Sequence, residues 1–236
     1  MTKGLSIGLR LIIIMGACSR GEETKAPTPA SNLVSAPTNF TLVVPSAQSA
    51  PTAPGMIERS YTVGRVGVLH LVFPKEWTDT IRKVVERDKQ FDAVQFAPTE
   101  GNDFAMMVEV MYVGETNMDK RDTRTVLLQA LQLQADQGEL ARSVEKSPDI
   151  QDFQGEQAAG SYFVVTDKNF SMLAQPGPDD YRYLMQGYAR LNGLVLTVRL
   201  VSNHIANQQP AVLEMIKTAR FTQNAIVRSP AQQSPH

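Results

Sequence analysis

Apolar and polar residues alternate in several short stretches between residues 57 and 221, which is the pattern of half-buried β-strands. In residues 104–112 every second side chain is large and apolar, so one face of a strand there would be buried. Residues 66–73 and 91–96 are rich in β-branched and aromatic side chains, and prolines, which end strands, follow both. Together with residues 160–166, these segments predict a domain built mainly from β-strands.

Asn192-Gly193 is the sequence of a two-residue type I′ hairpin turn. The turn fixes the register of the strands that it joins, because residues equally far from it face one another. One face is apolar and pairs Leu191 with Leu194, Ala189 with Leu196, Gly187 with Val198 and Met185 with Leu200. The reverse face pairs Arg190 with Val195, Tyr188 with Thr197 and Gln186 with Arg199.

Two segments have helical periodicity. Apolar residues recur four residues apart within residues 122–140, which predicts an amphipathic helix. A second helix is predicted at residues 208–219, with Asn207 as its N-cap and Pro210 in its first turn. The predicted fold class is therefore α+β, with an antiparallel sheet flanked by helices.

The reverse face of the hairpin carries a glutamine and three arginines, so we expect it to be at least half solvated. These side chains are either ordinary surface residues or the lining of a groove that accepts anions. The segment 167–180 is long for a connection between two strands, and it is either a tolerated surface excursion or a contact lobe for a partner or ligand. The candidate binding surface comprises Arg182, Gln186, Arg190, Arg199, Phe170, Asp179 and Asp180.

The N-terminus has the order of a secretory signal: two cations, a short apolar run and then Cys18, the only cysteine of the chain. It resembles a bacterial lipoprotein signal, in which a small residue precedes the cysteine that is acylated, although Met15 stands where the usual signal has leucine. The resemblance implies that residues 1–17 are removed and that Cys18 carries lipid. Ser19, where an aspartate would favour the inner membrane, favours the outer one. The alternative is an unmodified, buried cysteine.

The rest of the chain divides into three parts. Residues 18–56 hold six of the fourteen prolines and predict a flexible tether rich in Pro, Ala, Ser and Thr. Within it, residues 40–44 either add an edge strand to the domain or a partner or, as we favour, belong to the linker. Residues 57–221 form the predicted domain, and the polar residues 222–236 are predicted to be a disordered tail.

Charge and motifs exclude several functions. Removal of the signal would leave 21 basic side chains against 24 acidic ones, so the net charge would change from −1 to −3. Such a chain lacks the basic footprint of a nucleic-acid-binding protein, and we expect no nucleic-acid partner. The three histidines, His70, His204 and His236, lack the spacing of zinc ligands. With no nucleophile-elbow, Walker or dinucleotide motif either, we expect no metal, no cofactor and no enzymatic activity.

The order of elements from Gly67 to Phe221 resembles the PsbP-like domain, which occurs in photosystem extender proteins, a Ran-binding import factor and bacterial lipoproteins of the DcrB type. The resemblance rests on the segment Val72-Phe73-Pro74-Lys75-Glu76-Trp77, on the strand 104–112, and on the hairpin 185–199 before the closing helix. It implies an α/β/α sandwich with an antiparallel sheet and a non-enzymatic accessory or binding role. The family has no shared catalytic residues to carry over.

Together these features predict a lipid-anchored protein of the bacterial cell envelope, facing the periplasm, whose domain binds an envelope protein that the sequence does not identify. The alternative is a periplasmic carrier of a small molecule or lipid, which needs an apolar cavity between sheet and helix. A hydrolase is the least favoured alternative. Ser202 and His204 are close in sequence, but we interpret their proximity as coincidence.

Overall fold

The computed structural model describes residues 42–43, 54–86, 89–114, 122–136, 139–171, 177 and 180–224. The predicted signal with Cys18, most of the predicted tether, Asp179 and the last residues of the predicted tail lie outside the described residues.

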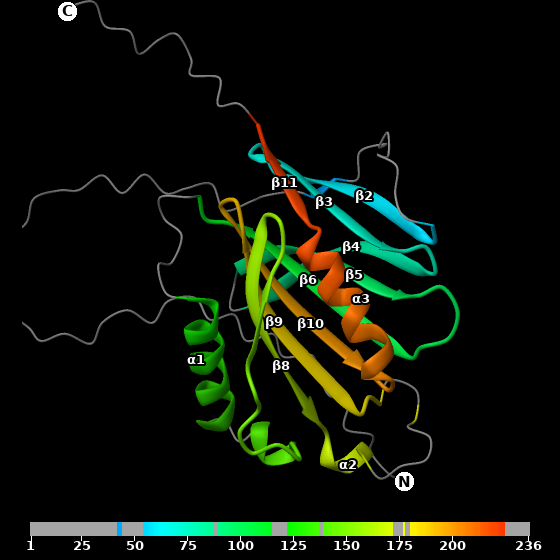
Figure 1. Ribbon diagram of the computed structural model, residues 1–236, viewed down its shortest axis with the longest axis vertical. Helices are drawn as coiled ribbons and strands as arrows, with labels where there is room; N and C mark the ends of the chain where they lie inside the picture. Colours follow the sequence, from blue (N-terminus) through cyan, green and yellow to red (C-terminus); the bar gives the residue numbers. More distant parts are fainter. Residues whose placement is uncertain are drawn as a thin grey trace, which may run out of the picture.

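The described strands form two antiparallel sheets (Figure 1). The small sheet has the order β1 (Leu42–Val43), β2 (Met56–Val63), β3 (Gly67–Pro74) and β11 (Arg220–Gln223). The large sheet has the order β4 (Trp77–Glu86), β5 (Lys89–Pro98), β6 (Phe104–Tyr112), β10 (Leu194–Ser202), β9 (Tyr183–Leu191), β8 (Ala158–Thr166) and β7 (Gln151–Gln154). The helical elements are α1 (Thr123–Asp136), the 3-10 turn η1 (Glu139–Arg142), α2 (Lys168–Ser171) and α3 (Ile205–Lys217).

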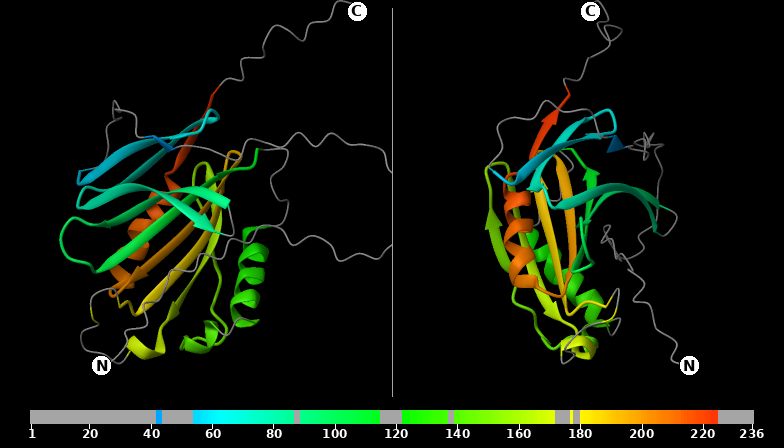
Figure 2. Two further views of the ribbon diagram at one scale, coloured as in Figure 1. Left: turned by 180° about the vertical axis from the view of Figure 1, so that it is seen from behind. Right: turned by 90° about the vertical axis from the view of Figure 1, so that its right-hand side faces the viewer.

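The main core lies between the two sheets and α3 (Figure 2). It is filled by apolar side chains that each element turns inward, among them Leu71 and Phe73 of β3, Phe96 of β5, Met106 of β6, Leu196 of β10, and Val212 and Met215 of α3. Phe73 and Phe96 meet edge to face with ring centroids 4.9 Å apart. Because Val212, Met215 and Ile216 are at most 1% exposed, the space between α3 and the sheets is closely filled.

A buried polar contact joins β2 of the small sheet to β4 of the large sheet. The fully buried Tyr61 of β2 donates its hydroxyl hydrogen to Asp79 Oδ2 of β4 at 2.9 Å, and Arg59 Nε lies 3.7 Å from Asp79 Oδ1. Burial raises the pKa of Tyr61, and the adjacent Asp79 carboxylate raises it further. The hydroxyl therefore remains a donor and fixes β2 against the edge of the large sheet.

The hairpin has the predicted register. Leu191 pairs with Leu194 and Gln186 with Arg199, and all the other pairs inferred from the turn are present. Asn192 has φ 43° and Gly193 has φ 83°, the left-handed conformations that a type I′ turn requires. The sequence left open which strand flanks the hairpin; β6 pairs with β10 on one side and β8 with β9 on the other.

Three boundaries differ from the predictions. Leu42–Val43 is an edge strand on Val63 and Thr62, where we favoured linker. Thr222 and Gln223, predicted to belong to the tail, pair with β3 because backbone pairing on an edge needs no apolar side chain. The long helix predicted at 122–140 ends at Asp136 and is followed by η1.

The last helix also begins elsewhere. α3 starts at Ile205, and its N-cap is His204 instead of the predicted Asn207. The His204 side chain makes no capping bond; the Ser202 hydroxyl accepts the His204 N–H at 2.8 Å and donates to Gln208 Oε1 at 2.9 Å. Pro210 consequently lies in the second helical turn and not in the first.

Helix α1 covers the outer face of the large sheet, opposite α3 (Figures 1 and 2). A second apolar cluster lies beneath it and consists of Leu127, Leu131, Ile150, Phe163 and Val165. Helices therefore contact β8 and β9 from both sides, whereas β4, β5 and β6 share the main core with the small sheet. The single sheet that we predicted is divided into two.

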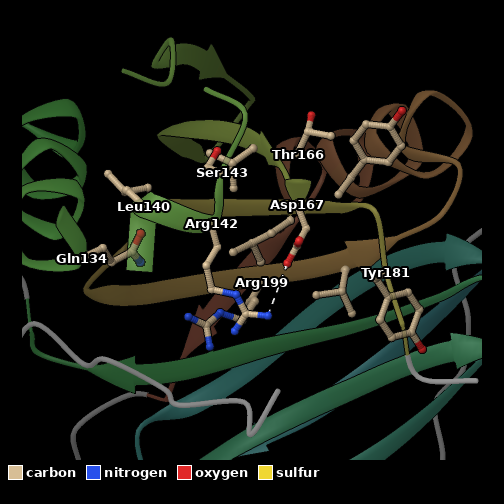
Figure 3. A pocket seen from close by; sticks show the side chains of 12 residues that line it. Gln134, Leu140, Arg142, Ser143, Thr166, Asp167, Tyr181 and Arg199 are labelled. Atoms are coloured by element: carbon tan, nitrogen blue, oxygen red, sulfur yellow. Dashed lines mark ion pairs between the residues drawn. The ribbon is translucent and has the colours of Figure 1, made fainter. Parts of the chain in front are cut away.

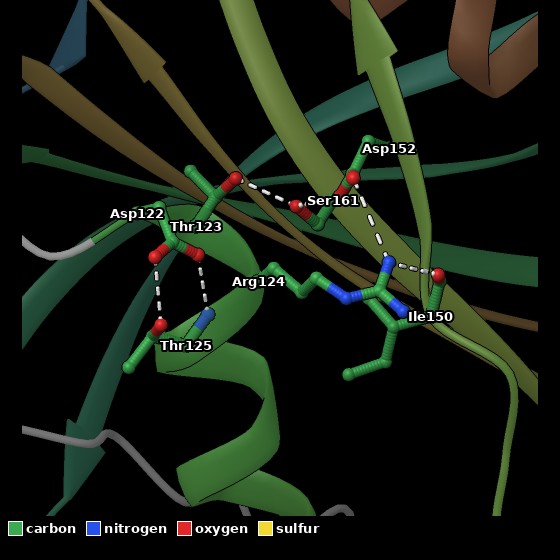
Figure 4. A network of polar contacts seen from close by, with 7 residues as sticks. All are labelled: Asp122, Thr123, Arg124, Thr125, Ile150, Asp152 and Ser161. Atoms are coloured by element: carbon green, nitrogen blue, oxygen red, sulfur yellow. Dashed lines mark hydrogen bonds and ion pairs between the residues drawn. The ribbon is translucent and has the colours of Figure 1, made fainter.

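Polar contacts hold the start of α1 on the sheet (Figure 4). Asp122 caps the helix by accepting the Thr125 N–H at 2.8 Å and the Thr125 hydroxyl at 2.7 Å. The hydrogen bonds from the Thr125 side chain and backbone lower the pKa of Asp122. Thr123 and Ser161 share a hydrogen bond of 2.6 Å, and Arg124 bonds the Ile150 carbonyl. The helix therefore approaches β8 in one fixed position.

We expect the buried amide pair between α1 and β9 to couple their stabilities. Gln134 Nε2 donates to Gln186 Oε1 at 2.9 Å, and the two residues are 4% and 6% exposed. Replacing either glutamine by leucine leaves the other amide unsatisfied and should lower the free energy of unfolding by about 1–3 kcal/mol. The double variant should lose less than the sum of the two single losses, as measured by urea denaturation.

The exposed Gln132 of α1 is the matched control for this cycle. Gln132→Leu should change the free energy of unfolding by no more than about 0.5 kcal/mol. Strictly additive losses in the double variant would show that the two amides are not coupled.

Candidate functional site

A pocket of about 220 Å³ opens on the outer face of the large sheet, beside the end of α1 (Figure 3). It lies where β8 ends and β9 begins, at the end of the sheet away from the Asn192-Gly193 turn. The lining residues are Gln134, Leu140, Arg142, Ser143, Val165, Thr166, Asp167, Tyr181, Tyr183, Leu184, Arg199 and Val201.

Two backbone links close η1 over this end of the sheet. Ser143 forms an isolated bridge with Asp167, and the Val144 N–H donates to the Thr166 carbonyl at 2.9 Å. The Asp167 N–H in turn donates to the Arg182 carbonyl at 2.7 Å. These links bring Arg142, at the end of η1, above a sheet face that carries Arg199.

Glu145 stabilises the same contact between the residues after η1 and the end of β8. Its carboxylate accepts the Thr166 N–H at 2.6 Å, the Thr166 hydroxyl at 2.7 Å and the Ser143 hydroxyl at 3.0 Å. Desolvation acts to raise the pKa of Glu145, but these hydrogen bonds, with one from its own backbone N–H, outweigh it and lower the pKa below the usual 4.5. The folded state therefore favours the ionised carboxylate of Glu145.

Charge in the pocket is predominantly positive. Figure 3 shows that the side chains of Arg142 and Arg199 converge on the same part of the pocket. Arg142 Nη2 lies 3.8 Å from Asp167 Oδ2, too far for a hydrogen bond, while Asp167 Oδ1 accepts the Asn169 N–H at 2.7 Å. Two arginines and one aspartate thus line the pocket, and the aspartate carboxylate is partly engaged by the Asn169 N–H.

The residues of the predicted binding surface lie in separate places in the structure. Arg199 lines the pocket, and Gln186 lies beneath α1, bonded to the pocket residue Gln134. The expectation of a solvated side chain is wrong for Gln186, because α1 covers it. Arg182 is half-buried and contributes its carbonyl to Asp167.

Arg190 lies at the other end of β9, beside the hairpin turn. It lies eight positions after Arg182, roughly 26 Å at the usual rise of a strand. Its Nε and Nη2 are buried without a hydrogen-bond partner among the described residues. The arginines of this face therefore do not form one continuous surface.

Among the described residues of the predicted loop, Asp167 is the one that lines the pocket. Phe170 is half-buried at the end of α2, and its N–H donates to the Asp167 carbonyl at 3.3 Å. The half-buried Asp180 accepts Asn203 Nδ2 through its backbone carbonyl at 3.1 Å. Asp179 lies outside the described residues.

Several pocket residues were not found from the sequence. Arg142, Ser143 and Tyr181 lie in a 3-10 turn or in coil, where no periodicity shows which way a side chain points. Long-range contacts, the Ser143–Asp167 bridge and the Val144–Thr166 hydrogen bond, place Arg142 and Ser143 at the end of the sheet. Arg182 and Arg190 were chosen from the sequence instead, because they belong to the polar face of the predicted hairpin.

The serine–histidine contacts do not have the geometry of an activated nucleophile. Ser60 Oγ and Glu58 Oε1 both approach the same nitrogen, Nδ1 of His70, at 2.9 and 3.3 Å. A catalytic triad needs the nucleophile on one ring nitrogen and the carboxylate on the other. The Ser202 hydroxyl contacts the backbone N–H of His204, not its ring.

The described residues contain neither a metal-binding cluster nor a membrane-spanning helix. No group of three or more histidine, cysteine, aspartate or glutamate side chains there is arranged to hold a metal ion. Within the same residues, none of the helices has the length and apolar character to span a membrane.

Comparisons with known proteins give a distant likeness in fold. No family model matches the chain, and no curated protein matches its sequence. Among solved structures, the solution structure of cyanobacterial PsbP (CyanoP) from Synechocystis sp. PCC 6803 is similar, with a TM-score of 0.44 and 9% sequence identity. The likeness covers 76% of this chain and 98% of that one.

We expect the Glu145 junction to make stability depend on acidic pH. Since the folded-state pKa of Glu145 is lowered, its contribution is fully present above the unfolded value of about 4.5 and is lost as the pH falls through the folded value. Glu145→Gln should lower the free energy of unfolding at pH 7 by about 1 kcal/mol, a figure reduced for solvent screening. The difference from wild type should shrink toward pH 3.

Denaturant melts of both proteins at pH 7, 5 and 3 would measure this difference. The exposed Glu156 is the control, and Glu156→Gln should follow the wild type at each pH. An unchanged difference between wild type and Glu145→Gln at pH 3 would contradict the assignment.

Proposed function

We propose that this chain is a lipid-anchored protein of the bacterial cell envelope whose domain binds a partner protein without catalysis. The observation that carries the proposal is the pocket with Arg142 and Arg199, which suits a negatively charged group of the partner. Arginine forks bind carboxylates with two parallel hydrogen bonds, which gives such a site orientation as well as affinity.

The size of the pocket favours a protein partner over a carried small molecule. Sites that enclose drug-sized ligands measure roughly 300–1,000 Å³. The pocket, at about 220 Å³, accommodates one side chain or a small anion. A carrier would also need space between α3 and the sheets, where Val212 and Met215 are fully buried against the core.

The surroundings of the pocket suit a protein interface. Val144 follows the lining residue Ser143 directly and is 51% exposed, although it is apolar. Tyr181 and Tyr183, at the start of β9, also line the pocket and are half-exposed. Tyrosine and arginine are the residue types most enriched where protein partners bind strongly.

The sequence supplies the support for the anchor. Cys18 follows a signal-like segment, and the pairing of Leu42–Val43 with β2 leaves residues 19–41 between the proposed lipid and the domain. As a flexible coil this segment would span about 25 Å, and as polyproline II about 70 Å. The domain would therefore stay within reach of proteins in the same membrane.

The anchor predicts a particular intact mass. Protein extracted from its native membrane should have the mass of residues 18–236 plus a diacylglyceryl group, with or without a further acyl chain. Cys18→Ser should abolish the added mass and release the protein from the membrane fraction. A wild-type chain that retains Met1 and carries no lipid would contradict this part of the proposal.

The binding function predicts a crosslink that depends on the pocket arginines. A photoreactive amino acid at position 144 should yield one discrete adduct in native membranes. Replacing both Arg142 and Arg199 by glutamine should reduce the adduct at least about fivefold, since the charge-assisted contacts are lost.

The exposed turn residues Arg65 and Lys75 provide a control with the same change of charge. Arg65→Gln with Lys75→Gln should leave the adduct unchanged. An adduct equally strong in the pocket variant would show that the partner binds elsewhere, and the absence of any adduct in the wild type would count against a protein partner at this face.

A further inference from the structure

Several other polar groups of the pocket are already paired with protein groups. The Ser143 and Thr166 hydroxyls donate to Glu145, and the Gln134 amide donates to Gln186. The two arginines are the charged donors among the lining residues.

Carboxylates at the pocket disfavour a ligand with two negative charges. Asp167 lines the pocket together with Arg142 and Arg199, and the Glu145 carboxylate bonds the lining residues Ser143 and Thr166. A phosphate group carries about −1.5 to −2 at pH 7, and its second charge would be close to these carboxylates. A carboxylate carries one charge and has the planar geometry that guanidinium groups bind.

The wall beside the arginines is apolar. Val165 is 7% exposed and belongs to the cluster beneath α1, and Leu140 and Leu184 pack against that cluster. Together with Val201 they line the same pocket as the two arginines. The group attached to the bound carboxylate thus meets apolar side chains and would bury its own apolar surface there.

A C-terminal residue combines these features. It presents a carboxylate and an apolar side chain on the same α-carbon, and the chain does not continue beyond it. An internal aspartate or glutamate has its carboxylate on a polar backbone that enters and leaves, for which about 220 Å³ leaves little room. Capture of a terminal carboxylate is a recurrent mode of peptide recognition.

We infer that the pocket formed by Arg142, Arg199 and the apolar wall binds the free C-terminal carboxylate of a partner protein that ends in an apolar residue. This inference rests on the proposed function and specifies its ligand. A free monocarboxylic acid with an apolar tail has the same chemistry, so the experiment must separate the two sources.

Ligand-observed NMR on the full-length lipidated protein in nanodiscs can test this inference. The probe is the peptide acetyl-Gly-Ser-Gly-Leu with a free carboxylate. Its comparators are the same peptide with an amidated end, an amidated peptide with an internal glutamate, isovalerate and inorganic phosphate. The free-acid peptide should bind, and amidation should weaken binding at least about tenfold because the charged acceptor is lost.

Variants of the protein connect this binding to the pocket. Arg142→Gln and Arg199→Gln should each weaken binding of the free-acid peptide about tenfold. Arg65→Gln, in the exposed β2–β3 turn, should bind the peptide as the wild type does. Thermal melts of each variant establish that it is folded. A folded pocket variant that binds like wild type would overturn the inference.

The comparators separate failure of this inference from failure of the proposed function. If the internal-glutamate peptide binds as tightly as the free-acid peptide, the ligand is not specifically a C-terminal carboxylate and the inference fails. The proposed function would stand, because an acidic side chain of a protein partner would still bind the pocket. Isovalerate or phosphate binding more tightly than the peptide would overturn both. If no probe binds but the position-144 crosslink is lost in the arginine variant, the inference fails and the proposed function stands.

Discussion

The pocket depends on how α1 is held on the large sheet. The Asp122 cap and the Thr123–Ser161 contact hold the start of α1 near the middle of β8, and the Gln134–Gln186 pair holds its last turn on β9. Gln134 thereby lines the pocket, and η1 and the residues after it cross the end of the sheet and bring Arg142 to the same place.

The two faces of the large sheet are held by different kinds of contact. The inner face is apolar and is stabilised by burial against α3 and the small sheet. The outer face includes the buried Gln134–Gln186 pair, which adds little net stability but is costly to break, because either amide alone would lose its only compensation for desolvation. Such a pair selects one position of α1 over neighbouring ones and thereby determines the shape of the pocket.

The sequence predicted those parts of the fold that depend on local chemistry. Asn192-Gly193 determines its own turn and, through it, the pairing of every residue of β9 and β10. The strand 104–112 was found with its bounds, because alternation of large apolar side chains is unambiguous over nine residues. The start of α3 was missed because the capping oxygen belongs to Ser202, which precedes the helix by three residues and lies inside a strand.

The pocket could be predicted only in part, since long-range contacts assemble it. Arg199 was identified because the hairpin places it on the outer face, but its companion Arg142 lies 57 positions earlier in the numbering and reaches the site through the Ser143–Asp167 bridge. Strands β2 and β4 were missed for a related reason. Arg59 and Asp79 both look like surface residues in the sequence; Arg59 is indeed exposed, but Asp79 is largely buried because it accepts the hydrogen bond of the buried Tyr61.

A pocket that holds one residue can be sufficient for function if the protein is anchored. A single charge-assisted contact with a few apolar neighbours supports dissociation constants near about 1 mM. A lipid on Cys18 and the segment 19–41 would confine the domain to a thin layer above the membrane, where the effective concentration of a partner anchored in the same membrane is itself about 1 mM. Under the proposed function, the small pocket and the anchor would act together: confinement would supply the affinity, and the arginines would supply the selectivity.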